Sequence, residues 1–389
     1  MEFDLSWILL GLPVAFILGW SASRLDIRQL RFENRQNPKA YFKGLNYLLN
    51  EQQDQAIDAF IQAVQLDPDT TELHFALGNL FRRRGEFERA VRVHEHLLAR
   101  GDLSAQDQER AQQALALDYL KAGLLDRAED GFQKLLTTRF KEQAQLALLS
   151  IYERTRDYPN AQRMASELEG SGQGDFKTRQ AHYLCEQAAL CMNHNDPQSD
   201  LSGAQRKARE LLHQAVSIAP HHPRAHIDLA DFEHSQGQTS IAFQIALELF
   251  ELCPSGVPLI CDRLLTWARA LGQVSKAQAA LTAFYEHSPS LDVLKALANL
   301  EPSTQKCQAL LSQHLQKDPS LLVASWWIDL EKLEHESDRP ALQKSLNRAT
   351  QPLNRYRCAA CGFEAQKHFW QCPGCQTWDS YPSQRVEEL

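Results

Sequence analysis

Residues 44–68 read GLNYLLNEQQDQAIDAFIQAVQLDP, and the spacing of residue types in this stretch decides the fold. Small and aromatic residues lie where two antiparallel helices would face each other, and a proline closes the stretch, where it can end the second helix. The pattern returns with a period of about 34 residues. Its first copy comprises Gly44, Tyr47, Ala56, Phe60, Ala63 and Pro68, and its second comprises Gly78, Phe81, Gly85 and Ala90.

Further copies follow in nearly the same phase. They comprise Ala116, Tyr119, Gly123, Ala128 and Phe132; Tyr152, Ala161, Ala165 and Leu168; Ala230, Gly237, Ala242, Ala246, Leu249 and Pro254; and Gly272, Ala277, Leu281, Phe284 and Pro289. Each unit is a pair of helices that cannot bury its apolar face alone and must stack on its neighbours. The repeats therefore predict an all-α tetratricopeptide superhelix.

A glycine-rich run at residues 170–175, GSGQGD, divides this array, because glycine and serine make a flexible joint. We expect a first sub-array at residues 37–170 and a second at residues 175–350. The repeat becomes degenerate towards the end of the second sub-array, where Trp326 and Trp327 lie on an apolar helix face. Two interpretations of these tryptophans stay open: they belong to the core, or they form a docking surface for the end of the chain.

A concave tetratricopeptide surface typically holds a peptide or another protein. In the second repeat, residues of the first helix fall on positions that usually face such a groove, and the arginines among them could pair with an acidic partner. A solvated helix face is the alternative. The predicted partner contacts are Phe75, Asn79, Arg82, Arg83, Trp326 and Trp327.

The sequence begins with an apolar segment. The run from Leu5 to Ala22 is uncharged and long enough to cross a bilayer, and arginines follow it, so the positive-inside rule puts the rest of the chain in the cytoplasm. We predict a single transmembrane anchor at residues 1–22. A juxtamembrane linker at residues 23–36 either rests on anionic lipid or is solvated. A cleaved signal peptide and a buried core helix are the alternatives for the apolar run.

Two Cys-x-x-Cys pairs stand near the other end of the sequence. Cys358, Cys361, Cys372 and Cys375 can together form a closed tetrahedral four-sulfur site. We predict a small rubredoxin-like or zinc-ribbon module at residues 354–382 that holds one metal ion, with zinc favoured and iron possible. The other five of the nine cysteines are scattered, which argues for buried thiols in a reducing compartment.

Composition and motifs exclude several classes of function. The formal charge of −8 at pH 7 argues against a nucleic-acid partner. The sequence contains no phosphate loop, dinucleotide fingerprint, zincin motif or nucleophile elbow, so we predict that the chain is not an enzyme. His222 and His226 are interpreted as surface or capping residues, because the sequence places no third ligand beside them.

The order of these parts resembles the lipopolysaccharide assembly protein B family of Gram-negative bacteria. The runs at residues 78–82, 118–119, 122–124 and 126–129 fit that family. The most specific matching residues are Arg355, Tyr356, Arg357, Cys358, Cys361, Gly362, Phe363, Trp370, Cys372, Pro373, Cys375 and Trp378.

This resemblance implies a protein of the inner membrane whose array and metal module lie on the cytoplasmic side. It implies an adaptor that promotes degradation of the lipid A pathway's committed deacetylase by a membrane-bound AAA metalloprotease. An inner-membrane lipopolysaccharide-sensing protein would counter it, and the metal module would pack on the repeats. A scaffold for lipopolysaccharide enzymes, an iron-based redox protein and a periplasmic repeat protein stay open as alternatives, and so does a homo-oligomeric state.

Overall fold

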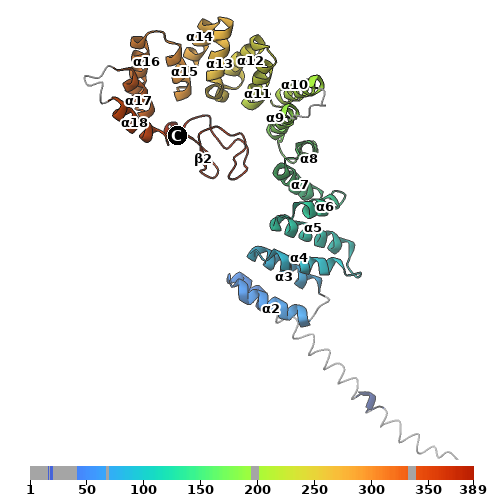
Figure 1. Cartoon of the computed structure of the whole chain (residues 1–389). Coiled ribbons are helices and arrows are strands. Elements are labelled where there is room, and N and C mark those ends of the chain that lie inside the picture. The colour runs from blue at the N-terminus through green and yellow to red at the C-terminus, as the bar shows by residue number, and fades with distance from the viewer. Residues whose placement is uncertain (1–15, 17, 21–41, 67–69, 194–200, 332–338) are drawn as a thin grey trace, which may run out of the picture. The chain divides into compact units, whose positions relative to one another are not determined.

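The computed structural model describes residues 16, 18–20, 42–66, 70–193, 201–331 and 339–389. Within these residues the chain is a series of helices followed by a small module with two short strands (Figure 1). Its contacts divide it into two compact units, Met1–Asp157 and Tyr158–Leu389. The predicted tetratricopeptide superhelix with a small terminal metal-ribbon module is confirmed.

The first unit consists of helices joined in pairs by glycines. Its helices are α2 (Gln53–Leu66), α3 (Thr71–Arg84), α4 (Phe87–Leu98), α5 (Ala105–Ala122), α6 (Leu125–Gln133) and α7 (Lys141–Thr155). Gly85 ends α3 with a φ of 83°, and Gly123 ends α5 with a φ of 78°. Glycine adopts this left-handed conformation without strain, which explains why the repeat spacing places a glycine at each of these turns.

The second unit continues the helical array and ends in the module. Its helices are α8 (Tyr158–Gly170), α9 (Lys177–Asn193), α10 (Leu201–Ile218), α11 (Pro223–Ser235), α12 (Thr239–Leu252), η1 (Pro254–Gly256), α13 (Val257–Leu271), α14 (Val274–His287), α15 (Leu291–Leu300), α16 (Thr304–Lys317), α17 (Leu321–Leu330) and α18 (Arg339–Thr350). The module contains β1 (Tyr356–Arg357), β2 (Glu364–Ala365) and η3 (Val386–Glu388). In Figure 1 the module lies on the inner side of the row of helices from α9 to α17.

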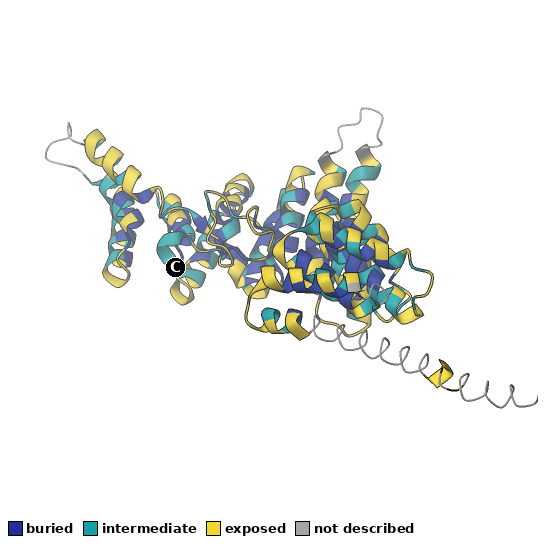
Figure 2. Cartoon of the chain, turned by 90° about the horizontal axis from the view of Figure 1, so that it is seen from below, coloured by how far each residue is buried: buried dark blue, intermediate teal, exposed yellow. Residues whose placement is uncertain are grey.

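Alanines at the repeat period let the helices approach each other closely. The fully buried ones include Ala56, Ala90, Ala128, Ala161, Ala242 and Ala277, each with 0% of its surface exposed. A larger side chain there would separate the two helices of a pair, because protein interiors are close-packed. Figure 2 shows the result, with buried positions on the helix sides that face other helices and exposed positions on the outer sides.

The predicted domain organisation included a glycine-rich joint and an N-terminal anchor with its linker. The contacts divide the chain after Asp157, whereas the glycine-rich joint predicted at residues 170–175 lies within the second unit, between α8 and α9. The predicted anchor and linker fall almost entirely outside the described residues. Among the residues that the structure does describe, none of the helices has the length and the apolar character needed to cross a bilayer.

A buried polar network holds α3, α4 and α5 together. Asp118 on α5 is fully buried, accepts a hydrogen bond from Arg82 Nη1 at 2.8 Å and lies 2.5 Å from His94 Nδ1. His94 is also fully buried, and its imidazole packs directly on Gly78 of α3. Because a buried carboxylate is costly unless it is paired, the arginine and the histidine both stabilise this unit.

Gly78→Ala should destabilise the first unit. A Cβ at this position would lie 2.5 Å from His94 Cε1 and Nε2, so the imidazole would have to move away from Asp118. We expect a loss of about 1–3 kcal/mol in the free energy of unfolding, the usual cost of overpacking a core. Thermal unfolding followed by circular dichroism measures it. Gly101→Ala is the matched control, since a Cβ there meets nothing within 4 Å, and equal stability of the two variants would contradict the prediction.

Candidate functional site

Two knuckles of similar backbone geometry present the four cysteines. In the first, the Gly362 N–H donates to the Cys358 carbonyl at 2.9 Å, and Gly362 has a φ of 77°. In the second, the Gln376 N–H donates to the Cys372 carbonyl at 2.8 Å, and Gln376 has a φ of 60°. The second knuckle thus keeps the left-handed turn without the glycine that usually provides it, at some cost in backbone strain.

The sulfur positions fit a tetrahedral metal ion. The Sγ atoms of Cys358 and Cys375 are 3.8 Å apart, and those of Cys361 and Cys372 are 3.7 Å apart. A tetrahedron with metal–sulfur bonds of about 2.3 Å requires sulfur–sulfur distances of about 3.8 Å. All four sulfurs lie within 4.8 Å of one another, so the set can surround one ion completely. Such a closed site leaves no position for a substrate, and zinc and iron both accept it.

Local hydrogen bonds favour the thiolate form of two of the four cysteines. Burial opposes ionisation of Cys358, but hydrogen bonds from the Ser380 hydroxyl and from the backbone of residues 360 and 361 outweigh it and lower the pKa of this thiol to about 6. The Thr377 hydroxyl and N–H lower the pKa of Cys375. A hydrogen bond from the backbone of Phe363 favours the thiolate of Cys361 too, but burial and the neighbouring thiols outweigh it and raise the pKa of this thiol to about 12. Cys358 and Cys375 are therefore prepared for coordination, whereas Cys361 would lose its proton when an ion binds.

The module docks on the array through residues on both sides of the second knuckle. The Trp378 indole stacks on the His182 imidazole of α9, with ring centroids 4.5 Å apart and an interplanar angle of 24°. Trp370 packs against the apolar core of the helices from α11 to α15, and Leu259 of α13 contacts the module core. Aromatic side chains of this size supply much of the apolar contact in such a small interface.

Asp379 forms the polar centre of this junction. One carboxylate oxygen lies 2.9 Å from His182 Nε2, and the other lies 3.2 Å from His222 Nε2. Burial raises the pKa of Asp379, but the hydrogen bonds from both imidazoles outweigh this and hold the pKa well below its usual range. Asp379 is therefore an ionised acceptor that joins α9 to the residue preceding α11.

Arg224 determines which ring nitrogen of His182 carries the proton. Its Nη1 donates to His182 Nδ1 at 3.1 Å, so Nδ1 is an acceptor and the single proton of the neutral ring is on Nε2, facing Asp379. Burial lowers the pKa of His182 to about 4 and keeps the ring neutral.

The cluster has the ligand types of a metal site but the proton positions of a hydrogen-bonded junction. His182, His222 and Asp379 offer ligand atoms within 4.8 Å of one another. A metal would need the lone pair of His182 Nε2, which carries the proton instead. The interpretation of His222 as a surface or capping residue was wrong, because it is 9% exposed and holds the module.

Comparison with known proteins agrees with this architecture. Residues 356–381 match the family described as rubredoxin metal binding domain, and residues 44–85 and 73–109 match tetratricopeptide repeat families. Lipopolysaccharide assembly protein B of Escherichia coli K12 is 30% identical over 97% of this chain and 97% of its own length. The chain belongs to the lipopolysaccharide assembly protein B family. The protein of that name from Haemophilus influenzae is 28% identical over 96% of each chain.

A crystal structure of a tetratricopeptide repeat protein from Parabacteroides merdae is also similar. It is 15% identical, with a TM-score of 0.33, and the match covers 68% of this chain and 98% of that chain.

The structure places the predicted partner contacts of this family member in different environments. Phe75 is 2% exposed, with the Arg110 guanidinium 4.0 Å from its ring centre, so it belongs to the core of the first unit. Asn79 bonds to Arg82, and Arg82 bonds to the buried Asp118. Arg83 is exposed and stays a predicted contact.

The two tryptophans of α17 are partly buried against the array, and none of the described contacts joins them to the module. Trp326 and Trp327 pack in a cluster formed by α15, α16 and α17, and Trp327 Nε1 donates to the Ser312 hydroxyl at 2.9 Å. Among the described contacts, the module reaches the array through Trp370 and Trp378 instead. Sequence reasoning missed His182 and Asp379, which are far apart in the chain and belong to no spaced motif.

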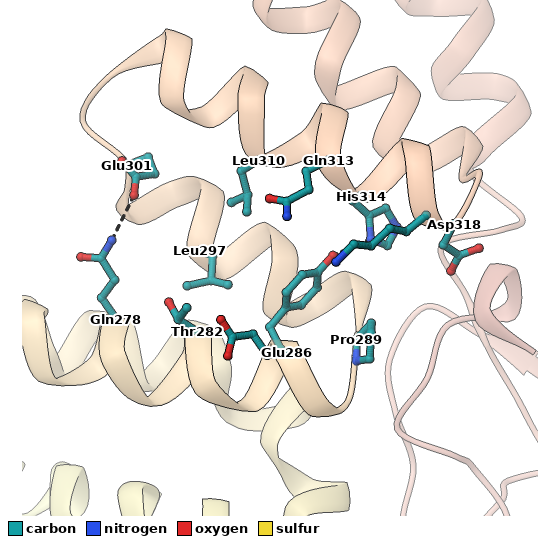
Figure 3. A pocket seen from close by; sticks show the side chains of 12 residues that line it. Gln278, Thr282, Glu286, Pro289, Leu297, Glu301, Leu310, Gln313, His314 and Asp318 are labelled. Atoms are coloured by element: carbon teal, nitrogen blue, oxygen red, sulfur yellow. Dashed lines mark hydrogen bonds between the residues drawn. The ribbon is translucent and has the colours of Figure 1, made fainter.

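A cleft of about 480 Å³ lies between α14 and α16 (Figure 3). The Tyr285 hydroxyl and His314 Nδ1 are 2.5 Å apart there, and Gln278 donates to Glu301 at 3.0 Å.

Cys361→Ser should release the metal and undock the module. Cys361 is exposed, so the exchange removes a ligand without removing buried packing. We expect the bound metal to fall from about one ion per chain to near zero, because a closed structural site needs all four ligands. Metal analysis measures the ion, and near-UV circular dichroism reports the packing of Trp370 and Trp378. Cys191→Ser is the matched control, and full metal occupancy in Cys361→Ser would contradict the prediction.

Lowering the pH from 7 to 5 should destabilise the second unit. His182 has a pKa of about 4 in the folded chain and 6.5 ordinarily, so between these values the unfolded chain binds a proton that the folded chain does not. Stability therefore rises with pH in this window, and His182 accounts for a loss of about 2 kcal/mol at pH 5. Denaturant unfolding followed by tryptophan fluorescence measures this.

His182→Gln isolates the contribution of that ring. The glutamine amide can donate to Asp379 and accept from Arg224 without titrating, so its stability should change less between pH 7 and 5. His213→Gln, at an exposed position of α10, is the control and should keep the original pH dependence. Equal slopes for the wild type and His182→Gln would show that the junction does not titrate as described.

Proposed function

We propose that this chain is a membrane-tethered adaptor that regulates lipopolysaccharide biosynthesis. The observation that carries the proposal is the match to lipopolysaccharide assembly protein B over 97% of both chains, which includes the array and the metal module together. The closed four-sulfur site supports a structural role for the metal rather than a catalytic one. In this proposal the chain is not an enzyme and acts only by binding other proteins.

The proposed activity is promotion of proteolysis. The adaptor presents the committed deacetylase of the lipid A pathway to a membrane-bound AAA metalloprotease, and an inner-membrane lipopolysaccharide-sensing protein counters it. The apolar run from Leu5 to Ala22 is the proposed single-pass anchor in the inner membrane, with the array and module on the cytoplasmic side. Tethering raises the effective concentration of the adaptor near a membrane-bound protease.

The first unit is the proposed client-binding part. The module already occupies the inner side of the helices from α9 to α17, which is the surface that such arrays commonly use for peptides (Figure 1). On α3, Arg82 is engaged by Asp118, whereas the neighbouring Arg83 is exposed. We therefore propose Arg83 as a contact for an acidic segment of the client.

The half-life of the deacetylase tests the proposal. Loss of this chain should lengthen the half-life severalfold, and Arg83→Glu should do the same in part, because charge reversal repels an acidic client. Arg92→Glu, at an exposed position of α4, is the matched control and should behave as wild type. The measurement is a chase of the deacetylase after translation is blocked.

The same experiment separates the adaptor from the alternative of a scaffold that gathers lipopolysaccharide enzymes without controlling proteolysis. A scaffold predicts an unchanged half-life in cells without the chain, together with loss of the enzyme assembly. That outcome would reject the adaptor proposal.

A further inference from the structure

The last six residues, 384–389, form a segment that we call the tail, and charged side chains attach it to the array. Arg385 makes a two-point ion pair with Asp292 at the start of α15, with Nε–Oδ2 and Nη2–Oδ1 distances of 2.9 and 2.8 Å. Its guanidinium also lies 4.1 Å from the centre of the Tyr356 ring and donates to the Asn354 carbonyl at 3.1 Å. A bidentate pair of this kind selects arginine over lysine, because only the planar guanidinium matches the carboxylate at two points.

The next two charged residues bind the starts of two helices. Glu387 accepts hydrogen bonds from the N–H of Leu321 at 2.5 Å and of Leu322 at 3.1 Å, at the start of α17. Glu388 accepts from the N–H of Leu291 at 2.8 Å, at the start of α15. The first N–H groups of a helix have no partner within the helix and carry partial positive charge, so each glutamate occupies a favourable anion position.

The array offers these positions in a repeated form. The same tripeptide, Pro-Ser-Leu, leads into α15 at residues 289–291 and into α17 at residues 319–321. The Ser320 hydroxyl donates to Glu387 at 2.7 Å. The α15 helix has no side-chain cap of its own at Ser290, and Glu388 supplies the acceptor there. Glu388 thus binds the start of α15 and Glu387 binds the start of α17, in two successive repeats.

Charged side chains and two backbone hydrogen bonds, rather than apolar burial, attach the tail. The N–H groups of Val386 and Glu387 donate to the Arg355 and Leu353 carbonyls at 2.7 and 3.2 Å. Leu389 is 61% exposed, and Val386 is only partly buried. A cavity of about 100 Å³ remains beneath the tail, lined by residues that include His314 and Asp318. The Arg385 and Asp292 side chains are each only 17% exposed, so salt screens this ion pair less than it would screen an exposed one.

We propose that Asp292 and the starts of α15 and α17 form a recognition site for an acidic segment of a second protein, one that carries an arginine two residues before a pair of acids. The tail is the resident ligand of this site within the same chain. A partner segment binds there by displacing the tail. This inference does not depend on the proposed proteolytic adaptor function.

A labelled peptide of residues 383–389, SQRVEEL, tests the site. A chain that ends at Ser383 should bind the peptide in fluorescence anisotropy, whereas the full chain should bind it at least about tenfold more weakly, because its own tail competes at high effective concentration. A peptide with glutamine in place of both glutamates should not bind. Raising the salt to about 1 M should weaken the binding only in part, because the Arg385–Asp292 pair is largely buried in the docked state.

Variants of the chain show where the peptide binds and distinguish loss of the site from misfolding. Asp292→Asn in the shortened chain should abolish binding, and Asp262→Asn, at an exposed position of α13, should not. The full chain with Glu387→Gln and Glu388→Gln retains the tail, but the tail should bind the array more weakly. The peptide should therefore bind this variant more tightly than it binds the wild type. The proposal is overturned if a shortened chain with unchanged circular dichroism and metal content fails to bind the peptide. Equal binding by the full chain would overturn it as well.

Discussion

The tetrahedral arrangement of four sulfurs is the constraint on which the second unit depends. The module has a small core of its own, formed by Tyr356, Cys358, Cys372 and Tyr381. Metal–thiolate bonds replace the apolar burial that such a short segment cannot supply. Once the second knuckle is fixed, Trp378 and Asp379 are fixed as well, because they follow it directly. These are the residues that reach α9 and the start of α11, so a metal held by the four cysteines would position a docking surface.

Docking of the module adds contacts that a simple row of repeats does not have. A tetratricopeptide solenoid is held by contacts between neighbouring repeats, so small changes at each interface add up to a large change of curvature. The module adds contacts between segments that are distant in the chain: Asp379 binds His182 and His222, and Arg385 binds Asp292. The docked module therefore connects helices of the second unit that are distant from one another in the chain. The inner side of the second unit is thus occupied by its own chain (Figure 1).

The sequence predicted what depends on local spacing and missed what depends on distant pairing. The repeat period located the turn glycines Gly85 and Gly123, and the cysteine spacing located the metal module. The junction of His182 with Asp379 has no local signal, since these residues lie in different elements far apart in the chain. The same period did not place Phe75, because the side of a helix that faces the groove depends on the angle to the next repeat. Trp326 and Trp327 were open to two interpretations for the same reason.

The residues that carry the family resemblance are largely those that hold the fold. Arg82 and Asp118 belong to the buried network of the first unit, and the matching residues of the module include the four cysteines and the tryptophans Trp370 and Trp378, which pack on the array. A likeness concentrated in such contacts explains why the architecture is shared at 30% identity. It also means that partner recognition has to be sought at exposed positions next to these residues. Arg83 beside Arg82 is one such position: Arg82 is tied to the buried Asp118, and the exposed Arg83 is then held at a defined place on the surface of α3.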